Sequence, residues 1–289
     1  MKKRRHRADG ERMNKPLDVE VHALQIAVEV AAAWRTRIAP RGPAIPLGVV
    51  ATIAAGGLLV DRPDHLAKVM MSASPGDFVG IARGVWGEVF ARRPDLAQWA
   101  YLLLDWLYGE TDERLRRRIK RTAEAALRAG QLELTTGRRR FTCDLLGPVL
   151  AALRSRPGLK VDTRMYAPSP TAWKLTAVSL RDLEPGRLFR DDAVGTGGLF
   201  RATAEVVRCQ GLDPADMRWF GADSDELAVA ATAINALIWE LGPEVFFYAG
   251  DVRAFPHWPD EAERQRAWFL EQVGSVNEAM ALLDYLKEF

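Results

Sequence analysis

The residues best placed to do chemistry form a glycine-rich stretch, Asp191–Gly198, which reads Asp-Asp-Ala-Val-Gly-Thr-Gly-Gly. It follows an apolar run and precedes a helix-like segment, so it is predicted to be the turn between a strand and a helix. Glycines at such a turn let the backbone approach a ligand closely, and the following helix N-terminus suits an anionic or nucleotide-like group. Gly195, Thr196 and Gly197 are therefore candidate ligand-binding residues.

Two further acids end the next apolar runs. Met217–Asp223 is predicted to be a second strand ending in Asp223, and Glu244–Asp251 a third strand ending in Asp251. In nucleotide-binding α/β folds, an acid at the end of the second strand accepts hydrogen bonds from ribose hydroxyls. An acid at the third strand end can accept from an adenine amino group. The turn lacks the Gly-x-Gly-x-x-Gly spacing of nicotinamide sites, which argues against that cofactor.

The elements that must position these acids are parallel strands joined by helices. Beyond residue 160, short apolar runs alternate with helix-like segments, which is typical of parallel βαβ units. We expect a truncated Rossmann-like α/β domain with about three parallel strands in the order 3-2-1. Because an exposed apolar edge strand is a liability, we expect the C-terminal helices, the N-terminal domain, a partner subunit or a second copy to cover it.

With these residues the chain resembles the adenine-N6 DNA methyltransferases, particularly the modification subunit of type I restriction-modification systems. That family has Asp-Pro-Ala-Cys-Gly-Thr-Gly-Gly at the turn, and here Asp192 replaces Pro and Val194 replaces Cys. Upstream, Tyr166 and Pro168 stand where the family has a Phe-Tyr-Thr-Pro segment. The resemblance covers roughly residues 160–252.

The resemblance implies that S-adenosylmethionine is the cofactor and that DNA is a partner. By it, the methionine part contacts Asp191 and Gly195–Gly197, the ribose contacts Asp223, the adenine amino group contacts Asp251, and Tyr166 and Pro168 form a wall of the pocket.

The family transfers a methyl group to a flipped-out adenine that is held by an Asn/Asp-Pro-Pro-Tyr/Phe loop. No such tetrapeptide occurs in this sequence. No catalytic residue is therefore assigned, and we expect a protein that binds the cofactor and transfers slowly, not at all, or with a partner. Two alternatives stay open: a non-catalytic DNA-binding or regulatory module on the same scaffold, and a small-molecule methyltransferase.

The first half of the chain is predicted to be mainly helical. We expect a basic disordered tail over 1–16, a helical domain over 17–157 and the methyltransferase-like domain, with C-terminal helices, over 158–289. An arginine-rich helix over 112–129 is followed by an alternating run, 132–136, and a glycine turn. This succession is typical of a winged-helix element.

Such a wing would contact DNA phosphates through Arg138, Arg139 and Arg140, together with Arg117 on the helix. The alternative is a solvated arginine-rich face packed on the other domain. A net charge of +2 over 289 residues does not by itself indicate nucleic-acid binding.

Composition excludes other classes of protein. Cys143 and Cys209 provide neither a metal-binding spacing nor a disulfide framework, which fits a reducing cytoplasm and no metal site. The most apolar run, Ala44–Val60, is shorter than the roughly 20 residues of a spanning helix, so no membrane anchor is expected.

Overall fold

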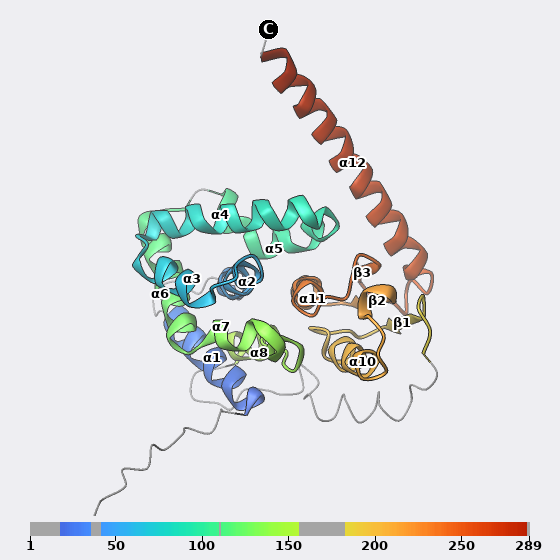
Figure 1. Ribbon diagram of the computed structural model, residues 1–289, viewed down its shortest axis with the longest axis horizontal. Helices are drawn as coiled ribbons and strands as arrows, with labels where there is room; N and C mark the ends of the chain where they lie inside the picture. The colour runs from blue at the N-terminus through green and yellow to red at the C-terminus, as the bar shows by residue number, and fades with distance from the viewer. Residues whose placement is uncertain (1–17, 36–41, 110, 156–182, 288–289) are drawn as a thin grey trace, which may run out of the picture.

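The structure is a computed structural model that describes residues 18–35, 42–109, 111–155 and 183–287, with side chains up to residue 275. The expected basic tail, residues 1–16, lies outside the described residues, as does most of the connection between the two expected domains. Figure 1 shows a helical region built from the first half of the chain beside a small sheet built from the second half.

The helical region contains eight α-helices and two 3-10 helices within the described residues. They are α1 (Val19–Trp34), α2 (Ala44–Leu58), α3 (Pro63–Ser72), α4 (Pro75–Arg92), η1 (Pro94–Leu96), α5 (Ala97–Tyr108), α6 (Glu113–Arg128), α7 (Gln131–Thr135), η2 (Gly137–Phe141) and α8 (Leu146–Arg154).

Helix α2 lies at the centre of this region because it has no polar face. All of its residues from Pro46 to Gly57 are buried, and α4, α5, α6, α7 and α8 pack around it. A helix that is apolar on every side is stable only when other elements enclose it. Among the described residues, none of the helices has both the length and the apolar composition needed to cross a membrane.

The second half forms a three-stranded parallel sheet in the order β1-β2-β3, with α10 (Gly198–Cys209) after β1 and α11 (Glu226–Ile238) after β2. The strands are β1 (Leu188–Asp191), β2 (Arg218–Asp223) and β3 (Val245–Ala249), with the short η4 (Pro214–Asp216) before β2. The predicted strands and their order are confirmed. Asp191 pairs with Gly221, and Asp223 pairs with Ala249, so the strand ends share one edge.

One face of the sheet joins the helical region. On this face Trp219 packs against Phe200 of α10, and Phe247 packs edge-on against Trp99 of α5. Helix α11 lies between the strands and α2 (Figure 1) and packs on α2, α5 and α8. A single cluster of buried apolar residues therefore runs from the helical region into the sheet.

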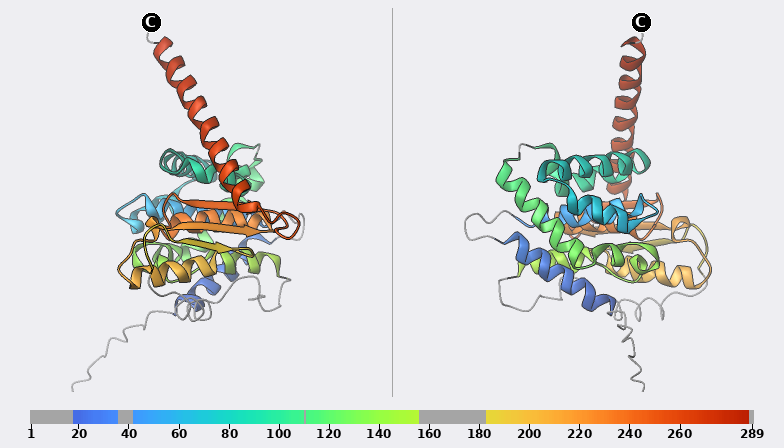
Figure 2. Two further views of the ribbon diagram at one scale, coloured as in Figure 1. Left: turned by 90° about the vertical axis from the view of Figure 1, so that its right-hand side faces the viewer. Right: turned by 60° about the vertical axis from the view of Figure 1, so that its left-hand side comes forward.

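The other face is covered by the start of α12 (Trp258–Lys287). Trp258 is fully buried there against Phe220 and Tyr248. The remainder of α12 projects away from the body of the molecule (Figures 1 and 2). The chain thus has a truncated α/β fold, with a helical N-terminal region and a three-stranded parallel sheet.

The expected winged-helix hairpin is wrong. Residues 131–135 form the single-turn helix α7, and residues 137–141 form the 3-10 helix η2, so no strand pair exists there. The hydroxyls of Thr135 and Thr136 donate to the carbonyls of Gln131 and Leu132, four residues earlier, and support the helical turn. Burial of Leu132 and Leu134 against the helical core satisfies the alternating apolar pattern without a partner strand.

Candidate functional site

The glycine turn follows β1 and opens α10, as predicted. Gly195 has φ 55° and Gly197 has φ 90°, both in the left-handed region that favours glycine. Gly197 is the N-cap of α10, and its N–H donates to the carbonyl of Val194 (2.8 Å). A Cβ at Gly197 would lie 2.9 Å from the ring of Trp239, so both the backbone conformation and the packing require glycine there.

Two side chains of α11 form hydrogen bonds to the backbone of this turn. The hydroxyl of Thr232 donates to the carbonyl of Gly195 (2.6 Å), and Asn235 Nδ2 donates to the carbonyl of Thr196 (2.8 Å). Both α11 side chains are buried. The backbone of the turn is therefore anchored by the helix that covers the sheet, rather than left as a loop in solvent.

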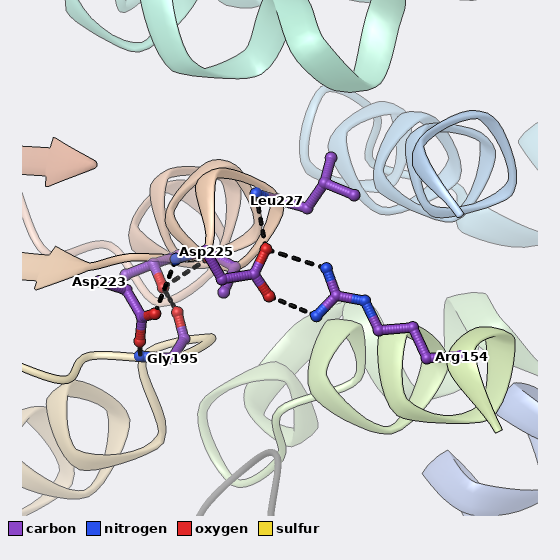
Figure 3. A network of polar contacts seen from close by, with 7 residues as sticks. Arg154, Gly195, Asp223, Asp225 and Leu227 are labelled. Atoms are coloured by element: carbon purple, nitrogen blue, oxygen red, sulfur yellow. Dashed lines mark hydrogen bonds and ion pairs between the residues drawn. The ribbon is translucent and has the colours of Figure 1, made fainter. Parts of the chain in front are cut away.

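Asp223 connects the turn to the ends of β2 and β3. Its Oδ2 accepts from the N–H of Gly195 (2.9 Å), and its Oδ1 accepts from the N–H of Asp225 (2.9 Å). Its carbonyl accepts from the N–H of Gly250 (2.9 Å), just beyond β3. Figure 3 shows the carboxylate between the turn and the start of α11. A carboxylate oxygen can accept more than one hydrogen bond, so the side chain keeps acceptor capacity for a ligand.

Asp191 ends β1 beside the same turn and is half-buried. Its Oδ1 accepts from the N–H of Ala193 (3.0 Å). Burial is the main cause that raises the pKa of Asp191, and the negative charges of Asp192 and Asp223 raise it further. Because two carboxylates, Asp191 and Asp223, lie near each other at this edge of the sheet, the edge favours a positively charged ligand.

Asp192 occupies the position where the resembling family has proline, and it points to α12. Its carboxylate accepts from Arg190 (2.6 and 3.1 Å), and Oδ1 also accepts from Trp258 Nε1 (3.0 Å). The guanidinium of Arg190 lies 5.0 Å from the Trp258 ring centroid. Asp192 thus ties the loop after β1 to the start of α12.

Asp251 follows β3 at the same edge and is exposed. Its Oδ1 accepts from the N–H of Arg253 (2.9 Å), and the preceding residue, Gly250, is bonded to Asp223. The structure therefore brings Asp191, Asp223, Asp251 and the glycine turn to one end of the sheet. Tyr166 and Pro168, the predicted pocket wall, lie outside the described residues.

The candidate DNA-binding arginines lie on two elements, Arg117 on α6 and the other three in η2. Arg138 is exposed in η2, but Arg140 forms an ion pair with Glu240, two residues after α11, and lies over the ring of Phe141. Arg117 is exposed on α6 and lies 3.8 Å from Glu113. In Figure 1, α6 is on the side of the helical region away from the strands.

The thiol of Cys143, which faces the core, has a pKa raised mainly by burial.

Three polar residues that position the turn were missed at the level of sequence: Asp144, Thr232 and Asn235. Asp144 lies two residues before α8 and accepts from the hydroxyl of Thr196 (2.5 Å). The available signal for it was an acid just before an apolar helical run, which is also typical of an ordinary N-terminal cap. Thr232 and Asn235 fall within a long apolar helix and carry no local signal.

The fold and the site together define a parallel α/β protein with its candidate ligand site outside the carboxyl ends of the strands, where such folds bind ligands. No protein-family model matches the sequence, and no curated protein matches it. A solved structure, the methyltransferase subunit of a type I restriction-modification system from Streptococcus thermophilus, is similar with a TM-score of 0.43 and 14% sequence identity. The match covers 84% of this chain and 60% of that chain, so this chain spans less than two thirds of its length.

Proposed function

We propose that this chain binds S-adenosylmethionine at the carboxyl edge of its sheet, as a protein of the DNA adenine-N6 methyltransferase type. One observation carries the proposal: the carboxylates of Asp191 and Asp223 flank a glycine turn, and the N–H of Gly195 donates to Asp223. This arrangement offers acceptors for hydroxyl groups and negative charge for a cation beside a backbone that a ligand can approach closely.

Charge distinguishes this cofactor from the common phosphate-bearing nucleotides. S-adenosylmethionine carries a sulfonium and an ammonium group, which two nearby carboxylates attract. The phosphates of ATP or of a dinucleotide would meet the same carboxylates and be repelled. The helix N-terminus of α10 favours anions, but its partial charge of about half a unit is smaller than that of two full carboxylates.

The residues of this chain would divide the cofactor between them. Asp191 and the turn from Gly195 to Gly197 would hold the methionine part, Asp223 the ribose hydroxyls and Asp251 the adenine amino group. When bound, S-adenosylmethionine supplies an electrophilic methyl group. Tyr166 and Pro168 remain proposed wall residues from the resemblance alone.

Replacing Asp251 with alanine tests the site with little risk to the fold, because this side chain is exposed. Loss of a charged acceptor for the adenine amino group should weaken S-adenosylmethionine binding about tenfold. Isothermal titration calorimetry measures the affinity. The matched control is Asp216→Ala, which removes an exposed acid at the opposite end of β2 and should leave the affinity unchanged. No binding by the wild type, or equal affinity for both variants, would reject the assigned site.

Binding should also weaken as the pH falls. The pKa of Asp191 is raised, so this carboxyl takes up a proton at a higher pH than an ordinary aspartate. The protonated form no longer attracts a cationic ligand, so affinity should decrease as the pH is lowered from neutral into the acid range. Calorimetry over this range with Asp191→Asn should give a flatter profile. Parallel profiles for wild type and variant would show that Asp191 does not face the cation.

The acceptor of the methyl group remains open between two classes. DNA is favoured by the resemblance and by exposed Arg117 and Arg138, although these lie on different elements. A small molecule recognised by the helical region is the alternative, and it does not need the absent tetrapeptide. The protein is incubated with methyl-labelled S-adenosylmethionine, DNA and a cell extract. Label in the DNA fraction would support DNA as the acceptor, and label in the small-molecule fraction would support the alternative. Binding of cofactor and DNA without transfer would favour the regulatory module.

We also propose that a partner subunit or a second copy covers the outer edge of β1. Among the residues that the structure describes, β1 pairs only with β2, and Leu188 at its start is 46% exposed. The start of α12 covers the adjacent sheet face but does not pair with the strand. Light scattering on the purified chain measures its mass. A monomer would rule out a second copy and leave the partner subunit as the proposed cover.

A further inference from the structure

Asp144 is a carboxylate buried in the helical region yet bonded to the glycine turn. The residue is 5% exposed, and burial raises the pKa of its carboxyl group. Three donors surround it: the Thr196 hydroxyl at 2.5 Å, Asn235 Nδ2 at 2.9 Å and the N–H of Gly147 at 3.0 Å. A buried carboxylate is tolerated only when such hydrogen bonds compensate for its lost hydration.

These bonds act on the residue at the middle of the turn. Thr196 is held twice, through its hydroxyl by Asp144 and through its carbonyl by Asn235 (2.8 Å). Asn235 Nδ2 thus bridges Asp144 and Thr196, which closes a buried polar network of three side chains. In a trans peptide the carbonyl and the N–H point in opposite directions. Since Thr232 holds the carbonyl of Gly195, the N–H of Thr196 points away from α11.

Helix α8, which begins two residues after Asp144, also contacts the segment that follows β2. Asp144 lies just before α8, and Arg154 lies in its last turn. Figure 3 shows Arg154 extending from α8 to Asp225, where Nη2 donates to Oδ1 (2.9 Å) and Nη1 pairs with Oδ2. The N–H of Asp225 in turn donates to Asp223 (2.9 Å). Asp144 therefore contacts the glycine turn just before α8 begins, and Arg154 contacts the segment Asp223–Asp225 where α8 ends.

We propose that α8 of the helical region positions two parts of the cofactor site, the glycine turn and the end of β2 at Asp223. Asp144 is the positioning residue for the glycine turn. The proposal rests on the proposed function, because its consequence for a ligand presumes binding at that turn. It goes beyond that function by making cofactor affinity depend on a residue outside the sheet domain. Asp144 is buried, so it would act on a ligand through Thr196.

The test compares Asp144→Ala with Asp95→Ala by calorimetry and by hydrogen exchange at the amides of residues 193–198. Asp144→Ala leaves the Thr196 hydroxyl without its acceptor and removes one of the two acceptors of Asn235 Nδ2. Affinity for S-adenosylmethionine should therefore fall about tenfold, and exchange in the turn should accelerate. Asp95 is also a buried acid of the helical region, paired with Arg93. Asp95→Ala should lower the melting temperature without changing either readout.

Two further variants keep the test decisive. Asp144→Asn keeps an acceptor for Asn235 and can donate to the Thr196 hydroxyl, so it should recover most of the affinity. If Asp144→Ala does not fold, Thr196→Val removes the same hydrogen bond from the other side and should show the same loss. Wild-type affinity and wild-type exchange in folded Asp144→Ala or in folded Thr196→Val would overturn the proposal.

The two hypotheses fail separately. If the wild type binds no S-adenosylmethionine, the proposed function fails, and hydrogen exchange alone judges the positioning role. Faster exchange of the turn in Asp144→Ala but not in Asp95→Ala would then support it, and equal exchange in both would overturn it.

Discussion

Replacing Gly197 with alanine is expected to destabilise the sheet domain and abolish tight cofactor binding. Gly197 has φ 90°, and a non-glycine residue in the left-handed region costs about 1–2 kcal/mol. The added Cβ would also lie 2.9 Å from the ring of Trp239, which is buried and cannot move aside freely. Overpacking of this kind costs about 1–3 kcal/mol more. Urea unfolding measures the free energy, and calorimetry measures the affinity.

Gly211→Ala is the matched control for this variant. Gly211 follows α10 with φ 80°, but a Cβ there would meet nothing within 4 Å. It should therefore show the conformational cost without the overpacking and leave cofactor affinity unchanged. The difference between the two variants isolates the contact with Trp239. Equal loss of stability in both would mean that the turn tolerates a side chain and is not held against α11.

Replacing Trp258 with alanine is expected to cause the largest loss of stability. This side chain is fully buried where α12 begins, packs against Phe220 and Tyr248, and donates to Asp192. Truncation of a buried tryptophan costs about 3–5 kcal/mol. Because α12 is the element that covers this face of the sheet, its start should detach. Urea unfolding followed by circular dichroism measures the loss without relying on tryptophan fluorescence.

The same helix supplies the control. Trp268 is 62% exposed, so Trp268→Ala should change the unfolding free energy by less than about 0.5 kcal/mol. Trp258→Phe should retain most of the packing while losing the hydrogen bond to Asp192, and should fall between the two. A Trp258→Ala protein as stable as Trp268→Ala would show that α12 does not stabilise the sheet.

The candidate site was predictable where its signals are local. The glycine turn, the acids at the ends of β1 and β2 and the acid after β3 each follow from a few adjacent residues. An apolar run ending in an acid predicts a strand end, and left-handed backbone at a turn selects glycine.

Local signals were insufficient where two structures satisfy the same pattern. The alternation at Leu132 and Leu134 fits a strand, but it also fits a single helical turn buried against other helices. Only the surrounding helical core, which buries both leucines and provides no partner strand, decides between them. The ion pair of Arg140 was not predictable for a similar reason, because its partner Glu240 lies far along the chain.

The sequence by itself determined the three strands, the turn between β1 and α10 and the acids at the strand ends, because short-range periodicity and glycine chemistry encode them. The tertiary structure decided what holds that edge together. Asp144 reaches Thr196, Arg154 reaches Asp225 and Asp192 reaches Trp258 only after distant segments pack. A polar contact between such segments depends on three-dimensional packing, and no spacing along the chain records it.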